Sequence, residues 1–158
     1  MRYCIDTSAI IEGWHKLFPP DIVPGFWEGV DELIKNGDLR ATEEVLIELE
    51  KKDDQIYSWA RQRNELFVPI DLDIQVYVRE ILAKYKTLID TRKNRSGADP
   101  FVIALAGLNK NTSTVVVTEE RLNEKIERPH IPDICAALDI GWINLNELVR
   151  KEGWKFHR

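Results

Sequence analysis

Residues 114–120 read TVVVTEE, an uncharged run of β-branched side chains followed directly by two acids. Valine and threonine favour strands because their branched Cβ packs well on a pleated surface. A strand without a charge needs both of its faces covered, which is typical of a parallel sheet packed between helices. The stretch therefore predicts a buried parallel strand over 114–118 that ends in carboxylates.

The rest of the chain alternates between short apolar runs and segments with helical periodicity. Further strand-like runs stand at 3–6, 67–70 and 142–144. Residues 15–24 contain three prolines and are expected to form a loop. Apolar residues at helical spacing predict helices over 25–35, 42–52, 53–66, 73–88, 99–108, 132–139 and 145–151. This alternation predicts an α/β fold with a central, mainly parallel sheet flanked by helices.

Length and composition narrow the class of protein. A chain of 158 residues is expected to form one domain over 1–158. No apolar run reaches the roughly 18 residues of a membrane span, and the N-terminal stretch lacks a signal-peptide pattern. Cys4 and Cys135 lie in apolar surroundings without metal-site spacing, which favours buried free thiols in a reducing cytoplasm. The net charge of −5 does not by itself favour binding of a polyanion.

Several acids interrupt apolar patterns or stand where predicted elements begin or end. These are Asp6, Glu48, Asp99, Glu119, Glu120 and Asp133. The carboxyl ends of parallel strands converge on one edge of a sheet, and carboxylates that meet there repel one another unless cations hold them. Oxygen ligands without His or Cys suit Mg²⁺ or Mn²⁺. The acids together predict a divalent metal site.

Each acid also has a structural interpretation when taken alone. Asp6 is suited to accept hydrogen bonds from a turn, and Glu48 stands four residues before Lys52, the spacing of a surface helical pair. Asp99 before Pro100 is a common way to cap a helix. The remaining acids are suited to the starts of helices. Only the order of the acids along the chain favours a shared site.

In that order the chain resembles the PIN-domain family. The motifs are Asp6-Thr7-Ser8 after the first strand, Glu48-Leu49 in a helix, Ala98-Asp99-Pro100 opening the apolar helix, and Val117-Thr118-Glu119-Glu120 after a strand. The resemblance runs from Tyr3 to about Asn144 and implies a three-layer α/β/α fold. The stretches FPPDIVPGFW (18–27) and IPDICAALDIGWINLNELV (131–149) also resemble a prokaryotic PIN-like subgroup, formerly of unknown function and related to VapC-like toxins.

The resemblance implies hydrolysis of RNA phosphodiester bonds by water that Mg²⁺ or Mn²⁺ activates. It makes Asp6 and Asp99 the expected metal ligands, with Glu48 and Glu120 binding directly or through water. The last family motif usually reads Thr-x-Asp, so Glu120 is a departure from the pattern.

Other residues near these motifs have supporting roles in this interpretation. The neighbouring Glu119 stays open as the fourth acid, and Asp133 as a further ligand. Ser8 and Thr118, and also Thr7, are expected to orient carboxylates or waters through their hydroxyls, although turns and caps explain them as well.

A basic segment precedes the apolar helix. Its residues Arg92, Lys93 and Arg95 either contact RNA phosphates near the site or are simply solvated.

The resemblance also implies a biological setting. An enzyme of this kind is expected to be the toxin of a type II toxin–antitoxin pair, held inactive by a small antitoxin protein, and a homodimer is in keeping with the family. A housekeeping RNA-processing nuclease and a catalytically inactive PIN-like binding module are the alternatives. A hydrolase of small phosphate esters is disfavoured because the sequence has no Gly-rich phosphate loop.

Overall fold

Five parallel strands form one sheet in the order β3-β2-β1-β4-β5. The computed structural model describes residues 1–86, 97–124, 127 and 129–158. The strands are β1 (Tyr3–Ile5), β2 (Leu39–Thr42), β3 (Phe67–Val68), β4 (Val115–Val117) and β5 (Trp142–Ile143). The strand predicted over 114–118 is the buried β4, which pairs with β1 on one side and β5 on the other.

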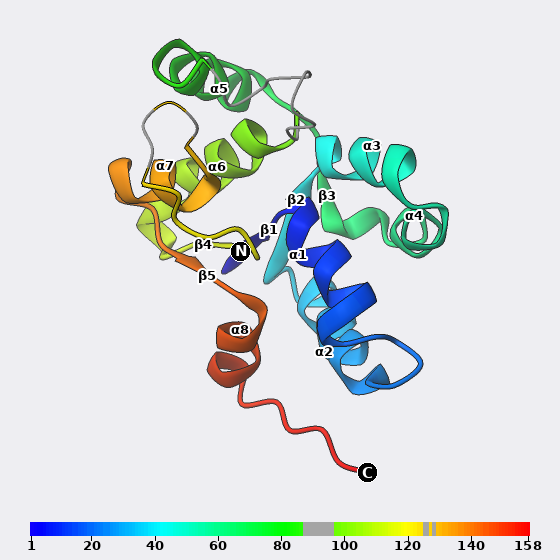
Figure 1. Cartoon of the computed structure of the whole chain (residues 1–158). Helices are drawn as coiled ribbons and strands as arrows, with labels where there is room; N and C mark the ends of the chain where they lie inside the picture. The colour runs from blue at the N-terminus through cyan, green and yellow to red at the C-terminus, as the bar shows by residue number, and fades with distance from the viewer. Residues whose placement is uncertain (87–96, 125–126, 128) are drawn as a thin grey trace.

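Helices cover both faces of this sheet. They are α1 (Thr7–Glu12), α2 (Pro24–Lys35), α3 (Glu43–Lys52), α4 (Asp54–Arg61), α5 (Leu72–Lys84), α6 (Asp99–Leu108), α7 (Ile131–Ala137) and α8 (Leu145–Glu152), with shorter turns of π-helix η1 (Gly13–Leu17) and 3-10 helix η2 (Asn64–Leu66) and η4 (Lys110–Thr112). Figure 1 shows α5 and α6 above the strands and α2 and α8 below them. The predicted α/β class, with helices flanking a central parallel sheet in three layers, is confirmed.

Neighbouring residues of β1 show how the two layers are built. The thiol of Cys4 donates to the carbonyl of Val102 in α6, at 3.5 Å. Ile5, the next residue, borders a small apolar cavity with Phe26 of α2 and Leu145 of α8. Successive side chains of a strand point to opposite faces, so β1 is buried on both sides, as a parallel strand between helices must be.

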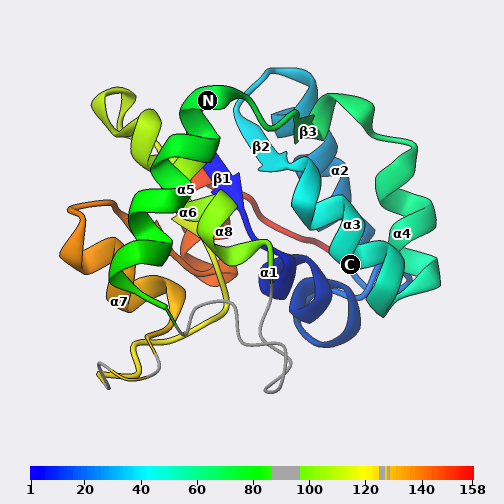
Figure 2. The same cartoon turned by 90° about the horizontal axis from the view of Figure 1, so that it is seen from above.

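Helix α6 is the central helix of its layer. It contacts β1, β2 and β4 and packs against α5 and α7, and Figure 2 shows it between α5 and the strands. Its near absence of charge follows from this burial on all sides. Gly107 permits the close approach of α5, because a Cβ at this position would come within 2.7 Å of the Tyr77 hydroxyl.

The structure differs from the sequence prediction in several segments, among them helix α1 (Thr7–Glu12), where no helix was predicted. Strand β2 was not predicted, because Leu39–Thr42 is short and includes Arg40. The predicted loop at 15–24 begins within the π-helix η1. The predicted helix over 53–66 is interrupted after Arg61, where the Arg63 guanidinium donates to the Trp59 carbonyl and to Asp31.

No helix within the described ranges combines the length and the apolar character that crossing a membrane requires.

The strand order determines where a site can form. The chain passes from β1 to β2 and β3 on one side, and β4 and β5 lie on the other. In such open sheets ligands bind in the crevice at the carboxyl ends of the strands where the order reverses. Here that position lies between the ends of β1 and β4, directly before Asp6 and Thr118.

Candidate functional site

Asp6 follows β1 and begins α1. Its carboxylate accepts a 2.8 Å hydrogen bond from the Ala9 backbone N–H, which makes it the N-cap of the helix. The Ser8 hydroxyl donates to the same carboxylate at 2.9 Å, and the Thr118 hydroxyl donates at 2.6 Å. Asp6 is only 1% exposed. The turn interpretation of this residue is therefore correct, and it coexists with the burial of a charged group at the switch point.

The surroundings of Asp6 disfavour its charged form. Burial raises the pKa of Asp6 from its ordinary value of 3.8 to about 7, and the negative charge of Glu120 adds to this effect. The hydrogen bonds from Thr118, Ala9 and Ser8 stabilise the carboxylate and oppose the rise in its pKa. A cation bound at this position would offset the cost of burying the charged carboxylate and its repulsion by Glu120.

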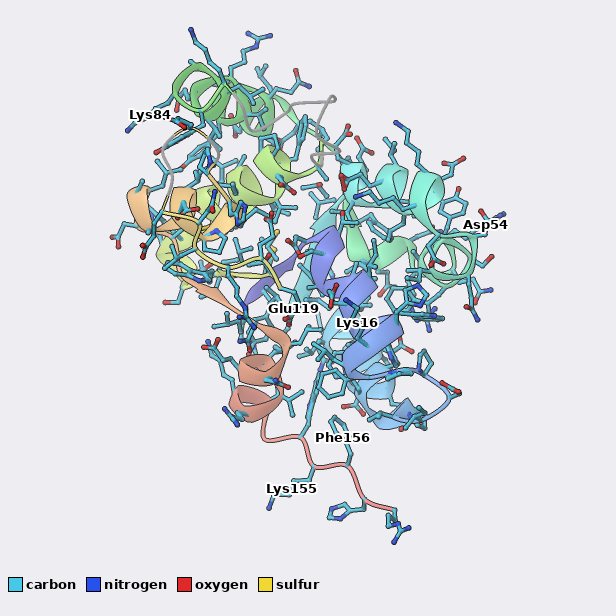
Figure 3. All side chains as sticks on the ribbon, viewed as in Figure 1. Lys16, Asp54, Lys84, Glu119, Lys155 and Phe156 are labelled. Atoms are coloured by element: carbon cyan, nitrogen blue, oxygen red, sulfur yellow. The ribbon has the colours of Figure 1, made fainter. Side chains whose placement is uncertain are left out.

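The two acids after β4 have different environments. The Thr118 hydroxyl accepts from the Glu120 N–H at 3.0 Å, and Glu120 affects Asp6 electrostatically. The Glu119 carboxylate instead accepts a 2.8 Å hydrogen bond from the N–H of Leu145, the first residue of α8. Figure 3 labels Glu119 near the middle of the molecule, between α1 and α8. Glu119 therefore stabilises the start of α8. The Glu120 carboxylate accepts a longer, 3.4 Å hydrogen bond from the Ile131 N–H at the start of α7, and its charge is the one that acts on Asp6.

Glu48 lies in α3 and is only 9% exposed. Its Oε2 accepts a 2.8 Å hydrogen bond from the Thr7 hydroxyl at the start of α1. Its Oε1 lies 3.5 Å from the backbone nitrogen of Ala98, the residue before Asp99. The side chain thus points toward the starts of α1 and α6, not along the solvent-exposed side of its own helix.

Asp99 is the first residue of α6 and is 7% exposed. The residue in the capping position is Ala98, without a side-chain cap. The interpretation of Asp99 as the helix cap is therefore wrong by one residue.

Asp133 holds the connection that leads into α7. It accepts hydrogen bonds from the backbone N–H groups of His130 at 2.8 Å, Asn123 at 3.0 Å and Glu124 at 3.1 Å. Burial raises the pKa of Asp133, but these hydrogen bonds outweigh it and keep the pKa below its usual value. The helix-start interpretation of this residue is correct.

The predicted basic contacts, Arg92, Lys93 and Arg95, fall within 87–96 and lie outside the described residues. In sequence this segment directly precedes α6 and Asp99.

The donor set can be tested against a divalent cation. Among the side chains that the structure describes, no three from His, Cys, Asp and Glu already have the spacing of a metal site. The chemistry of the site still fits a hard cation, because the negative charge of a second carboxylate, Glu120, acts on the buried Asp6.

One further oxygen at this edge was not found from the sequence. The Thr42 hydroxyl is buried and has no hydrogen-bond partner within the described part of the chain. The register of β1 and β2 pairs Cys4 with Arg40, so Asp6 and Thr42 each follow two residues later, at the carboxyl ends of neighbouring strands. A buried hydroxyl without a partner costs free energy unless something binds it. The location of Thr42 at this edge could not be predicted, because strand β2 was not predicted.

Residues 3–156 match a family described as a domain of unknown function, DUF4411. No curated protein matches the chain.

Proposed function

The chain belongs to the DUF4411 family, and we propose that it is a Mg²⁺- or Mn²⁺-dependent endoribonuclease of the PIN type. The observation that carries the proposal is the buried Asp6 carboxylate at the switch point of the sheet, hydrogen-bonded to Thr118 and electrostatically coupled to Glu120. Sites of open α/β sheets form at this position. RNA as the substrate is taken from the PIN resemblance.

Two sets of hydrogen bonds lead from the start of α1 to the other acids, and they support a shared site. Ser8 and Thr118 connect Asp6 to the β4 end, where the Glu120 N–H donates to the Thr118 hydroxyl. On the other side, Thr7 donates to Glu48. The Glu48 carboxylate in turn lies next to the N–H that precedes Asp99.

In the proposed mechanism Asp6 and Asp99 would hold the ion, and Glu48 and Glu120 would bind it directly or through water. Such an ion would supply an activated water for hydrolysis of the phosphodiester bond. Ser8 and Thr118 fix the orientation of the Asp6 carboxylate. The ribose 2′-hydroxyl takes no part in this chemistry, so the products would carry a 5′-phosphate and a 3′-hydroxyl.

The toxin role, a small antitoxin partner and a homodimer are proposed from the resemblance to VapC-like toxins. Growth arrest on induction, relieved by a small neighbouring gene, would support the toxin role. Expression without growth arrest would favour a housekeeping RNA-processing nuclease with the same chemistry.

The direct test of the proposed reaction is cleavage of a labelled single-stranded RNA with Mn²⁺ and with excess EDTA. We expect cleavage only with the metal, and none by Asp6→Asn or Asp99→Asn protein that is folded by circular dichroism. Cleavage that persists in EDTA would exclude the metal mechanism. RNA binding without cleavage would favour an inactive PIN-like binding module, for which the Glu120 departure is the one specific argument.

A further inference from the structure

A cavity of about 310 Å³ adjoins the acids at the carboxyl edge of the sheet. Thr118 and Glu120 belong to its wall, so it is continuous with the candidate metal site. The rest of the wall comes from the segment after β4, from β5 and from the start of α8, with Leu17 of η1. Ligand sites in proteins span roughly 300–1,000 Å³, so this volume suits one small planar group.

The side chains of this cavity combine an aromatic ring with polar groups at the surface. Trp142, on the edge strand β5, is half-buried. Asn146 in the first turn of α8 and Arg121 after β4 are both exposed. An indole ring offers a stacking surface, and an amide can both donate and accept hydrogen bonds.

The acids in the wall decide which part of a nucleic acid fits. The Glu119 carboxylate accepts from the Leu145 N–H, and the Glu147 carboxylate accepts from the Asn144 N–H at 3.3 Å. Both charges are thus engaged at the N-terminus of α8, where the helix dipole favours them. Even so, their negative potential repels phosphate, whereas it leaves an uncharged heterocycle unaffected.

We propose that this cavity binds one nucleobase of a single-stranded RNA, adjacent to the phosphate that the acids address. The inference rests on the proposed function for its substrate. The base stacks on Trp142, and Asn146 contacts its hydrogen-bonding edge. Bases of a duplex are already stacked and paired, so occupation of the cavity requires an unpaired strand.

The test is a double-mutant cycle that combines removal of one RNA base with removal of the Trp142 ring. The Asp6→Asn protein, which does not cut, binds a short fluorescein-labelled single-stranded RNA in Mg²⁺, and anisotropy gives Kd for the intact RNA and for versions with one abasic nucleotide at each position. We expect one abasic position to weaken binding roughly 5- to 150-fold, the range of a base–aromatic stack. Adding Trp142→Leu should weaken binding of the intact RNA by the same factor. In that variant, the abasic nucleotide at the sensitive position should cause no further loss of affinity.

Further variants separate the base site from folding effects and from the nuclease proposal. Asn146→Ala, at an exposed helical position, should show the same coupling if Trp142→Leu does not fold, whereas Arg150→Ala, exposed on the same helix outside the cavity, should leave Kd unchanged. The base site would be overturned if the abasic nucleotide and the protein variant weakened binding by independent factors that multiply. It would also be overturned if no abasic position weakened binding specifically. Coupling in a protein whose wild type never cuts RNA would retain the base site and reject the nuclease. Cleavage by the wild type without this coupling would retain the nuclease and reject the base site.

Discussion

The Asp6 carboxylate at the end of β1 accepts a 2.6 Å hydrogen bond from the hydroxyl of Thr118 at the end of β4, 112 positions along the chain. This bond connects the two strands between which the order of the sheet reverses. It fixes the orientation of the carboxylate that the proposed metal site depends on. It also opposes the rise in the pKa of Asp6 that burial causes.

Thr118→Val should therefore raise the pKa of Asp6 further and weaken Mn²⁺ binding at neutral pH, by about 10- to 100-fold as for other residues that orient ligands. Isothermal titration calorimetry measures the affinity. The matched control is Thr114→Val, which removes a hydroxyl that donates to the Met1 carbonyl at the other end of β4. Equal losses of affinity in the two variants would contradict a specific role of Thr118.

The buried Asp6 should make the metal-free protein less stable as pH rises. Its folded pKa of about 7 lies above its ordinary value of 3.8, so the folded state holds a proton that the unfolded state releases first. The free energy of unfolding should fall between about pH 4 and pH 7, by a few kcal/mol at most. Asp6→Asn should abolish this decrease and exceed the wild type in stability at pH 8. Urea unfolding at pH 5 and pH 8 measures both effects.

Mn²⁺ should reverse that order of stability. Binding to the folded state alone stabilises it, so the ion should raise Tm of the wild type at pH 8 and leave Asp6→Asn unaffected. An equal rise in Tm for both proteins would place the ion elsewhere.

Thr42→Val should leave the metal-free protein as stable as the wild type or more stable. The Thr42 hydroxyl is buried with no partner among the described residues, and burial of such a group costs about 1–3 kcal/mol. If that hydroxyl binds the ion or its water, the variant should also lose Mn²⁺ affinity. Thr118→Val, whose hydroxyl has partners, should instead lose stability. A large destabilisation by Thr42→Val would show that the hydroxyl already has a structural role.

Glu119→Gln and Glu120→Gln should separate the two neighbouring acids. Glu119→Gln retains an acceptor for the Leu145 N–H but removes a charge at the start of α8, which should cost about 0.3–1 kcal/mol and little activity. Glu120→Gln should lower the pKa of Asp6, because its charge raises that pKa, and should abolish RNA cleavage. The opposite pattern of activities would identify Glu119 as the fourth acid.

The fold could be predicted where complete burial of an element requires an almost uncharged stretch of sequence. The uncharged residues of β4 and α6 show that they are covered on all sides, and both were found. Strand β2 could not be predicted, because its four residues form a strand only by pairing with β1 and β3, through Tyr3 and Leu39 among others. The location of Thr42 at the carboxyl edge of the sheet depends on those pairings.

The candidate site could be predicted in part for the same reason. The sequence predicts which acids stand at the ends of helices and strands, but it does not predict their hydrogen-bond partners. Glu119 lies at the start of α8, whereas Glu120 lies at the start of α7 and acts electrostatically on Asp6. Asp133 differs from the other acids because the backbone N–H groups of Asn123, Glu124 and His130 fold back onto it.

The central claim is that these acids hold a divalent ion at the switch point of the sheet. A crystal structure with Mn²⁺, with anomalous data at the manganese edge, tests it most directly. We expect an anomalous peak within coordination distance of the Asp6 and Asp99 carboxylates, with Glu48 and Glu120 bound to the ion or to its waters. A fully soaked crystal with no peak at Asp6, or with manganese bound elsewhere, would contradict it.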